Sequence, residues 1–319
     1  MPSDRPLIIA HRGASGYLPE HTLEAKALAF GMGADFLEQD VVASRDDQLI
    51  VLHDIHLDRV TDVAERFPDR HRADGRFYAR DFDLGELRSL RVWERLNKAG
   101  DEVEFPNRFP AGSGNFGIVT LQEELEFVAG LNASSGRTVG IYPEIKRPAW
   151  HKADGVDLSP RLLEILDRFG YRDAADPAFV QCFDAREVER LRNDLGCRLR
   201  LIQLIGENDW FESDTDYDQL RTAEGLARVA KTTDGIGPGL WQLYTLAEID
   251  GQPVSTGLAS LARSLELAVH PYTFRADQLP PGFETFEASV QWFVATLGID
   301  GLFTDFPDLA IQAIRNNHL

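Results

Sequence analysis

Short apolar runs of strand length alternate with segments of helical periodicity along almost the whole chain, and this alternation limits the possible folds more than any other feature. A helix is expected at 160–169 and another after Thr120, a predicted N-cap with Glu123 three residues on. Over 319 residues this order predicts an α/β fold of the TIM type, a (β/α)8 parallel barrel. An open doubly wound sheet is the alternative, but its glycine fingerprint is missing after the first strand. The predicted strands are residues 7–11, 36–42, 49–53, 140–144, 179–183, 199–205, 235–238, 267–270 and 301–304.

One long stretch does not follow the alternation. Residues 55–116 are polar and rich in Arg, Asp, Gly and Pro, and their aromatic residues suggest a small packing of their own. We interpret the stretch as an insertion that folds over the strand ends and shapes a pocket. With 43% hydrophobic residues, no linker and no internal repeat, residues 1–319 are expected to form a single catalytic domain.

A proline falls within one of the predicted strands. A central parallel strand loses a ladder hydrogen bond at proline. We therefore expect Pro143 to lie in the last turn of its strand, where the chain is already leaving the sheet.

The charge balance of the chain is strongly acidic. Its formal net charge is −19, which repels nucleic acid and anionic membranes, so we expect neither a nucleic-acid partner nor stable membrane association. The longest apolar runs are too short to cross a bilayer, and the start of the chain has no apolar segment of signal-peptide length. The expectation is a cytoplasmic protein as written, or a periplasmic one if a leader has been removed. The sequence leaves the oligomeric state open.

Two histidines each follow an apolar strand. His11 comes after Leu7-Ile8-Ile9-Ala10, and His53 after Leu49-Ile50-Val51-Leu52. In barrels of this type, active sites are built at the carboxyl ends of the strands. A lone histidine in such a place is usually structural. Two of them beside a cluster of carboxylates fit a general acid and a general base better.

Three carboxylates also occur on predicted strands. Glu38 and Asp40 are two residues apart, so both side chains point to one face, either the barrel lumen or the helix layer. Glu144 on the next main strand would complete an oxygen-only set of ligands. Such a set favours one divalent metal ion, Ca²⁺ or Mg²⁺. The alternative is that these are solvated acids or ion-pair partners.

Cationic and aromatic side chains accompany these groups. Arg12 offers a fork for phosphate oxygens and Lys146 a point charge, although both also neutralise the nearby acids. His21 is expected to be a local hydrogen-bond partner at the start of a helix. The chain has no G-x-S-x-G, Walker or paired C-x-x-C sequence, which gives serine hydrolases, P-loop enzymes and cysteine zinc sites no support. Weaker candidates for lining the pocket are Phe183, His270, Tyr272 and Trp292.

These residues carry a resemblance to a known family, the glycerophosphodiester phosphodiesterases. The series His11-Arg12, Glu38-Gln39-Asp40 and His53-Asp54 resembles the family's H-R, E-x-D, H-D signature. Pro143-Glu144-Ile145-Lys146 resembles its later P-E-I-K segment, and Pro19-Glu20-His21-Thr22 its P-E-N-T-like turn, with histidine replacing the commoner asparagine. The chain is most similar to the bacterial periplasmic type, through residues 57–62 and 66–70.

The resemblance implies hydrolysis of glycerophosphodiesters, such as glycerophosphocholine and glycerophosphoethanolamine, to sn-glycerol 3-phosphate and an alcohol. By position, it implies that Glu38, Asp40 and Glu144 bind the metal ion, with His11 and His53 as the acid–base pair. Arg12 and Lys146 would hold the phosphate, and the reaction would pass through a cyclic phosphate. The resemblance also implies a TIM-type barrel with an insertion at roughly 55–116.

Two other functions remain open at this point. One is a related barrel phospholipase that acts on intact phospholipids or lysophospholipids. Such an enzyme should carry an exposed apolar rim or a basic patch, and the sequence indicates neither. The other is a catalytically silent metal-binding barrel, which the presence of both histidines disfavours.

Overall fold

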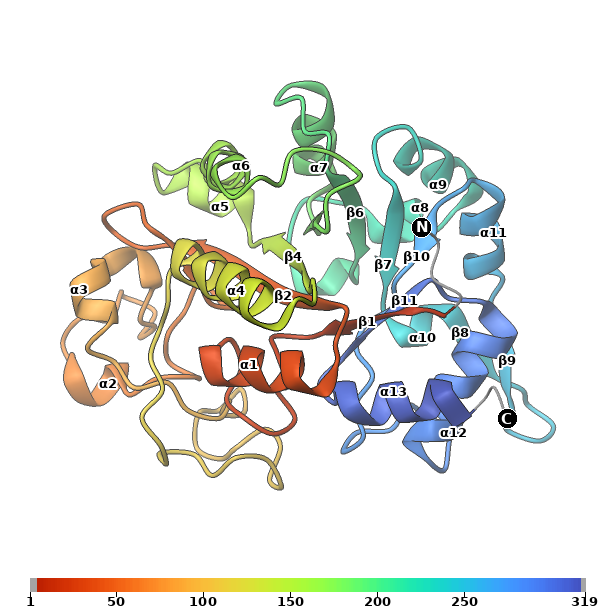
Figure 1. The fold of residues 1–319 in the computed structure, drawn as a ribbon, viewed down its shortest axis with the longest axis horizontal. Helices are drawn as coiled ribbons and strands as arrows, with labels where there is room; N and C mark the ends of the chain where they lie inside the picture. The colour runs from red at the N-terminus through yellow and green to blue at the C-terminus, as the bar shows by residue number, and fades with distance from the viewer. Residues whose placement is uncertain (1–4, 317–319) are drawn as a thin grey trace.

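The strands form a nearly closed parallel barrel. The computed structural model describes residues 5–316, and its eight barrel strands follow the order β10-β7-β6-β5-β4-β2-β1-β11 (Figure 1). Backbone bonds close the ring, from Asp300 N to Val269 O and from Phe303 N to Pro271 O, both 3.0 Å. The barrel prediction is therefore confirmed, whereas the open sheet is not found. The strands are β1 (Leu7–Ala10), β2 (Phe36–Ala43), β4 (Gly140–Ile145), β5 (Phe179–Cys182), β6 (Arg200–Ile205), β7 (Gly235–Pro238), β10 (Ala268–Val269) and β11 (Gly301–Thr304).

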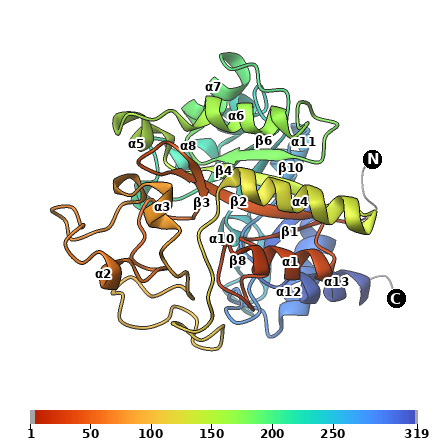
Figure 2. The same cartoon turned by 60° about the vertical axis from the view of Figure 1, so that its left-hand side comes forward.

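Helices form a layer outside the strands (Figures 1 and 2). The longer ones are α1 (Leu23–Met32), α4 (Leu121–Ser135), α6 (Leu158–Arg168), α7 (Ala185–Asn193), α9 (Ala223–Val229), α11 (Leu258–Ser264), α12 (Phe286–Trp292) and α13 (Pro307–Asn316). The predicted cap of α4 is confirmed, because Glu123 N donates to Thr120 Oγ1 at 3.1 Å and the Glu123 carboxylate accepts from Thr120 N. Shorter elements are α2 (Val63–Arg66), η1 (Ala79–Asp81), α3 (Leu84–Leu87), α5 (Pro148–Ala153), η2 (Asn208–Trp210), α8 (Tyr217–Leu220), α10 (Leu240–Leu243), η3 (Phe293–Leu297) and the pair β8 (Tyr244–Leu246) and β9 (Pro253–Ser255). The residues Met1–Asp4, part of the segment searched above for a leader, lie outside the described range.

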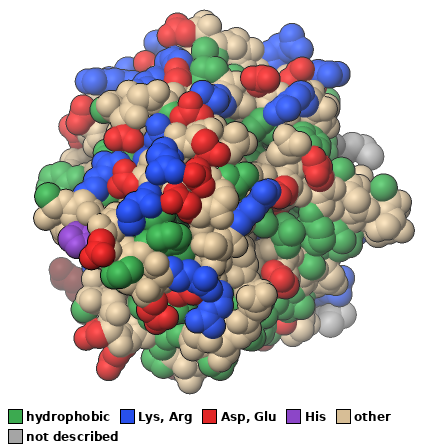
Figure 3. Space-filling model, turned by 90° about the vertical axis from the view of Figure 1, so that its left-hand side faces the viewer, with side chains coloured by type: hydrophobic (Ala, Val, Ile, Leu, Met, Phe, Trp, Pro, Cys, Tyr) green, Lys and Arg blue, Asp and Glu red, His purple; other side chains and the backbone are tan. Residues whose placement is uncertain are grey.

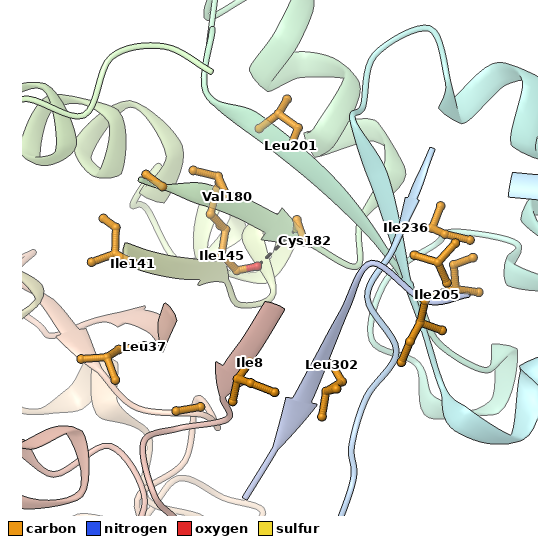
Figure 4. Packing of buried hydrophobic residues seen from close by; sticks show 14 of the residues in the cluster. Ile8, Leu37, Ile141, Ile145, Val180, Cys182, Leu201, Ile205, Ile236 and Leu302 are labelled. Atoms are coloured by element: carbon orange, nitrogen blue, oxygen red, sulfur yellow. Dashed lines mark hydrogen bonds between the residues drawn. The ribbon is translucent and has the colours of Figure 1, made fainter. Parts of the chain in front are cut away.

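The side chains of the barrel strands alternate between two packing environments. Outward-facing residues such as Ile8, Leu37 and Leu302 pack against the helices, as Figure 4 shows. Inward-facing residues fill the barrel interior with a second, smaller apolar cluster, formed by Ile9, Phe36, Tyr142, Phe179, Ile202 and Phe303. Because the side-chain period of a strand is two, the next inward positions toward the carboxyl ends lie directly above this cluster. Most of those positions are polar in this chain, and Leu204 of β6 is the apolar exception.

The predicted strand at residues 49–53 is not a barrel strand. β3 (Leu49–Val51) pairs antiparallel with β2, with Val51 opposite Val41. The connection is a short turn, in which Ser44 N donates to Gln48 O at 3.0 Å. A parallel crossover would need a dozen or more residues, so a turn this short produces a hairpin. His53 consequently returns toward the barrel from outside it, rather than ending a parallel strand as expected.

The expectation for Pro143 is also wrong. Pro143 lies inside β4, directly opposite Gln39 of β2. Toward β5, β4 pairs only through Glu144 with Gln181, together with an isolated bridge from Ile141 to Ala178. The gap between these two pairs coincides with the residue that has no N–H to donate. The barrel therefore tolerates the proline by giving up part of one ladder.

Residues between β3 and α4 pack around an apolar cluster of their own. Phe82, Leu57 and Val60 lie in this cluster with Val42 and Ile50 of the β2–β3 hairpin. The segment lies to one side of the barrel in both ribbon views (Figures 1 and 2). On this face, acidic and basic side chains are interspersed, so the net negative charge does not gather there (Figure 3). The limits of the insertion and the single-domain assignment stay predictions.

A buried ion pair supports β2 from the helix layer. Lys26 of α1 and Glu124 of α4 have no exposed surface, and their side chains meet at 2.7 Å. Lys26 also donates to the backbone oxygen of Glu38, and Gln39 donates to Glu124 Oε1 at 2.8 Å. Removing one member of a buried pair leaves an uncompensated charge in the interior. This pair thus couples two helices to the strand that carries Glu38.

We predict that Lys26→Met lowers the free energy of unfolding by ~3–5 kcal/mol, because Glu124 would remain buried without its ammonium partner. Urea denaturation followed by circular dichroism measures this loss. The double variant Lys26→Met with Glu124→Gln should recover part of it, since the stranded charge is removed. A single variant as stable as the wild type would contradict the prediction.

Candidate active site

Three carboxylates meet in the barrel lumen above the apolar interior cluster. Glu38 and Asp40 face inward from β2, and strand pairing sets Asp40 directly beside Glu144 of β4. One ligand oxygen from each residue lies within 4.8 Å of the others. All three residues are buried, with at most 4% of their surface exposed. The lumen, and not the helix layer, is therefore the face to which they point.

The donor set fits a divalent metal ion. Asp40 Oδ1 is buried and has no hydrogen-bond partner. Burial and the charge of Asp40 raise the pKa of Glu38 to about 8. Burial also raises the pKa of Glu144 well above its usual range, although Lys146 opposes this. A hard, oxygen-preferring cation would relieve the repulsion among these crowded carboxylates and bind the unpartnered oxygen. The cluster therefore supports a divalent metal.

His11 is held by an aspartate from the other end of the chain. Its Nδ1 lies 2.6 Å from Asp305 Oδ1, just after β11, and its Nε2 lies 3.9 Å from Glu38 Oε2. Burial lowers the pKa of His11 to about 4, with the charge of Arg12 acting in the same direction and Asp305 opposing it. A neutral imidazole that donates its Nδ1 proton to Asp305 keeps a free lone pair on Nε2. His11 thus lines the cavity with an unprotonated Nε2.

His53 has the same arrangement with its own neighbour. Its Nδ1 lies 2.6 Å from Asp54 Oδ1, and its Nε2 lies 3.5 Å from Lys146 Nζ. Burial lowers the pKa of His53 to about 3, and the charges of Arg12 and Lys146 lower it further. Asp54 also accepts from Arg95 Nη1 at 2.7 Å. The hairpin thus delivers a second neutral, aspartate-anchored imidazole.

Arg12 and Lys146 are the cations of the cavity. The backbone N–H of Arg12 donates to Glu38 at 2.8 Å, while its Nη1 donates to Glu20 at 2.8 Å. Its Nε is buried without a hydrogen-bond partner. Lys146 donates to Glu144 at 2.7 Å, and the charges of Glu144 and Glu212 raise its pKa despite burial. Both cations are therefore fixed and charged at neutral pH.

The predicted charged residues surround one cavity of about 400 Å³. Its lining includes His11, Arg12, Glu38, His53, Glu144 and Lys146, while Asp40 lies beneath it, 1% exposed. Phe183 and Tyr272 also line the cavity, as expected. The structure brings these residues together, and their individual roles stay predictions.

The expectations for His270 and Trp292 are wrong. His270 is 1% exposed inside the barrel, where its Nδ1 lies 2.9 Å from Tyr142 Oη. Trp292 ends α12 and packs against Tyr244 and Phe283 in the helix layer. Both rings pack among other aromatic side chains, and neither lines the cavity.

Sequence reasoning missed several supporting residues. His21 is not a local partner, since its Nε2 lies 2.7 Å from Asp40 Oδ2, and Gln181 of β5 donates to Glu38 at 3.0 Å. Glu20 accepts from Arg95 Nε at 2.8 Å as well as from Arg12. For Gln181, the inward period of its strand is a usable signal. No signal in the sequence indicates that Arg95, which lies between β3 and α4, pairs with Glu20.

Three exposed aromatic side chains form an apolar rim beside the cavity, which the sequence analysis did not predict. Trp210 is 41% exposed, Phe211 80% and Trp241 48%. They follow β6 and β7, and Trp210 and Trp241 line the cavity. The expectation of no exposed apolar rim is therefore wrong.

Within residues 5–316 no helix is long and apolar enough to cross a membrane.

The fold and the site define a (β/α)8-barrel enzyme with its chemistry at the carboxyl ends of the strands. The model of the glycerophosphoryl diester phosphodiesterase family matches residues 11–309, and the chain belongs to this family of phosphodiester hydrolases. It is 42% identical to the Haemophilus influenzae glycerophosphodiester phosphodiesterase, over 99% of this chain and 91% of that protein.

Solved structures share the fold. The crystal structure of a Silicibacter pomeroyi protein superposes with a TM-score of 0.75 at 23% identity, covering 99% of this chain and 96% of that one. An Oleispira antarctica phosphodiesterase, solved in complex with the product sn-glycerol-3-phosphate, superposes with a TM-score of 0.63 at 18% identity. The alignment with this second protein covers 98% of this chain and 97% of that one.

We predict that divalent-cation binding releases protons at pH 7. The pKa of about 8 for Glu38 means that its carboxyl is largely protonated in the metal-free protein, and a ligating carboxylate must be ionised. Affinity for Ca²⁺ should therefore rise as the pH approaches 8. Isothermal titration calorimetry in two buffers of different ionisation enthalpy counts the protons released. Asp40→Asn should lower the affinity at least about tenfold, and a pH-independent affinity would contradict the assignment.

Proposed function

We propose that the protein hydrolyses glycerophosphodiesters, such as glycerophosphocholine and glycerophosphoethanolamine, to sn-glycerol 3-phosphate and an alcohol. The observation that carries this proposal is the shared cavity, in which two aspartate-anchored histidines and two cations surround the three-carboxylate cluster. The name of the Haemophilus influenzae relative and the product bound to the Oleispira antarctica protein support the same reaction.

A single Ca²⁺ or Mg²⁺ ion is the metal that this proposal requires. Glu38, Asp40 and Glu144 would hold it through carboxylate oxygens. When bound, it would polarise phosphoryl oxygens and neutralise the charge that builds up in the transition state. His21 and Gln181 would orient the ligands, because each already donates to one of these carboxylates.

Arg12 and Lys146 would position the phosphate of the substrate. Arg12 Nε makes no hydrogen bond in the cavity wall, where it lies 3.6 Å from Asp40 Oδ2, and Lys146 lies between Glu144 and His53. Guanidinium and ammonium donors bind phosphoryl oxygens through charge-assisted hydrogen bonds. An anionic phosphate placed here also offsets the positive charges that lower the pKa of His53. Substrate binding therefore favours a protonated imidazole in a site where both histidines start neutral.

The two histidines would exchange a proton with the substrate at their Nε2 atoms. One accepts the proton of the glycerol hydroxyl next to the ester, and this hydroxyl oxygen attacks phosphorus in line. The bond to the alcohol breaks, and the other histidine, which takes up a proton from solvent when the phosphate binds, protonates the leaving oxygen. The product is a cyclic glycerol phosphate, which water opens with the two roles reversed. Asp305 and Asp54 would stabilise whichever imidazolium forms.

We predict that His11→Ala and His53→Ala each lower kcat ~10²-fold or more, because either variant removes one proton-transfer group. Release of glycerol 3-phosphate from glycerophosphocholine measures the activity, and Ca²⁺ titration should show that the metal affinity is largely kept. Chelator should abolish the wild-type activity, and added Ca²⁺ or Mg²⁺ should restore it. Full activity in excess chelator would contradict the metal requirement, and an active wild type with active histidine variants would refute the acid–base assignment.

We further predict that a substrate without the neighbouring hydroxyl binds but does not turn over. In such a deoxy diester no oxygen is held next to phosphorus for the intramolecular attack. Competitive inhibition of glycerophosphocholine hydrolysis measures binding, and phosphorus NMR follows turnover. Hydrolysis of the deoxy diester at a normal rate would mean that water attacks directly.

A further inference from the structure

One end of the cavity is walled by aromatic rings. We call Phe183, Trp210, Trp241 and Tyr272 the aromatic wall, and all four line the cavity that holds His11. The ring centroids of Trp210 and Trp241 lie 5.8 Å apart at 57°, and those of Trp241 and Tyr272 lie 6.0 Å apart at 87°. Phe183 and Tyr272 are 5.9 Å apart at 84°. Rings set at steep angles to one another bound a space on several sides instead of forming one flat patch.

Specific contacts hold this wall in place. Tyr272 Oη donates to Ile205 O at 2.7 Å, and Trp241 Nε1 donates to Glu207 Oε1 at 2.6 Å. A Cβ on Gly239 would lie only 2.5 Å from the Trp241 indole, so this ring rests on bare backbone. The same atom on Gly206 would lie 3.2 Å from Trp210. The rings are thus preorganised, which lowers the entropy lost on binding.

Three rings of the wall have faces that are open to a cation. Lys98 and Arg275 also line the cavity, but neither stacks on these rings. Lys146 Nζ lies 5.5 Å from the Phe183 centroid, so the inner end already holds one ammonium group. Among residues 5–316, no lysine or arginine stacks on Trp210, Trp241 or Tyr272. The Glu212 carboxylate lines the same cavity, 3.3 Å from Arg147 and 3.9 Å from Lys146. Aromatic faces beside a carboxylate are the surroundings that bind quaternary ammonium groups.

A second pocket lies beside the cavity. It measures about 160 Å³ and shares His11, Arg12, His53, Glu104 and Arg275 with the cavity. Its remaining lining residues are mostly charged, and Arg59, Glu94, Arg95, Arg108 and Asp305 are among them. Charged hydrogen-bonding groups suit the small polyol arm of a diester. The aromatic wall is then left for the arm that carries the alcohol.

We propose that the aromatic wall and Glu212 form a subsite for a methylated ammonium group on the leaving alcohol, so that the enzyme prefers diesters of a cationic alcohol. The inference rests on the proposed function, since it concerns the leaving group of that reaction. It adds a preference among alcohols. Trp210 and Trp241 would contact the methyl groups through their faces, and Glu212 would balance the charge.

The test compares two substrates that differ in one atom. Glycerophosphocholine carries a trimethylammonium group, and its 3,3-dimethylbutyl analogue carries a neutral tert-butyl group of the same shape. We expect the ratio of kcat/KM values to favour choline about tenfold or more in the wild type. Trp241→Leu and Glu212→Gln should each bring this ratio down several-fold. An effect of Glu212→Gln on the neighbouring Lys146 would change kcat/KM for both substrates alike, so it would not change their ratio.

Phe211→Ala is the matched control, because Phe211 is more exposed than either tryptophan and does not line the cavity. It should leave the ratio unchanged. A wild-type ratio near one would overturn the subsite while leaving the proposed function intact. A drop in the ratio for Phe211→Ala equal to that for Trp241→Leu would overturn it as well, in favour of a general apolar rim.

A binding measurement separates the two proposals if neither diester is hydrolysed, an outcome that would refute the proposed function itself. Choline and 3,3-dimethylbutanol are then titrated against tryptophan fluorescence. Tighter binding of choline, weakened by Trp241→Leu, supports the subsite. Equal binding of the two alcohols overturns it.

Discussion

The repulsion among three buried carboxylates is the constraint on which the rest of this structure depends. Glu38, Asp40 and Glu144 share one layer of the barrel lumen, where water cannot screen them. Three polar side chains nearby donate to these carboxylates: His21 to Asp40, Gln181 to Glu38 and Lys146 to Glu144. None of these donors would otherwise belong in a barrel interior. The lumen is organised around these carboxylates, which together could hold a divalent metal ion.

Much of this arrangement could be predicted from the sequence, because strands impose a period of two. Once residues 36–42 are recognised as a strand, Glu38 and Asp40 must share a face with Phe36, and the polar layer must sit above an apolar one. The direction of the chain between strands is harder to predict. The turn after β2 makes a hairpin where a parallel strand was expected, since the apolar run of β3 alone does not reveal its orientation. Pro143 was misplaced because the ladder loses a bond without ending the strand.

The supporting contacts escaped prediction for a different reason. Asp305 reaches His11 across 294 residues, and Arg95 reaches Glu20 across 75. Such pairings are decided by how loops fold over the barrel, and single-sequence patterns do not encode them. The same holds for His270 and Trp292, whose rings are aromatic core in positions where a pocket was equally consistent with the pattern. Periodicity locates a face, but only tertiary packing decides what fills it.

The segment between β3 and α4 braces the cavity residues from outside the barrel. Arg95 binds both Glu20 and Asp54, and Arg108 binds Asp305, so arginines from outside the barrel brace the partners of Arg12, His53 and His11. The segment has its own apolar cluster, separate from the main core. Local opening of such a unit costs less than global unfolding. A barrel with this segment detached would keep its strands and lose the alignment of its imidazoles, so catalysis would report on the stability of the brace and not on that of the barrel.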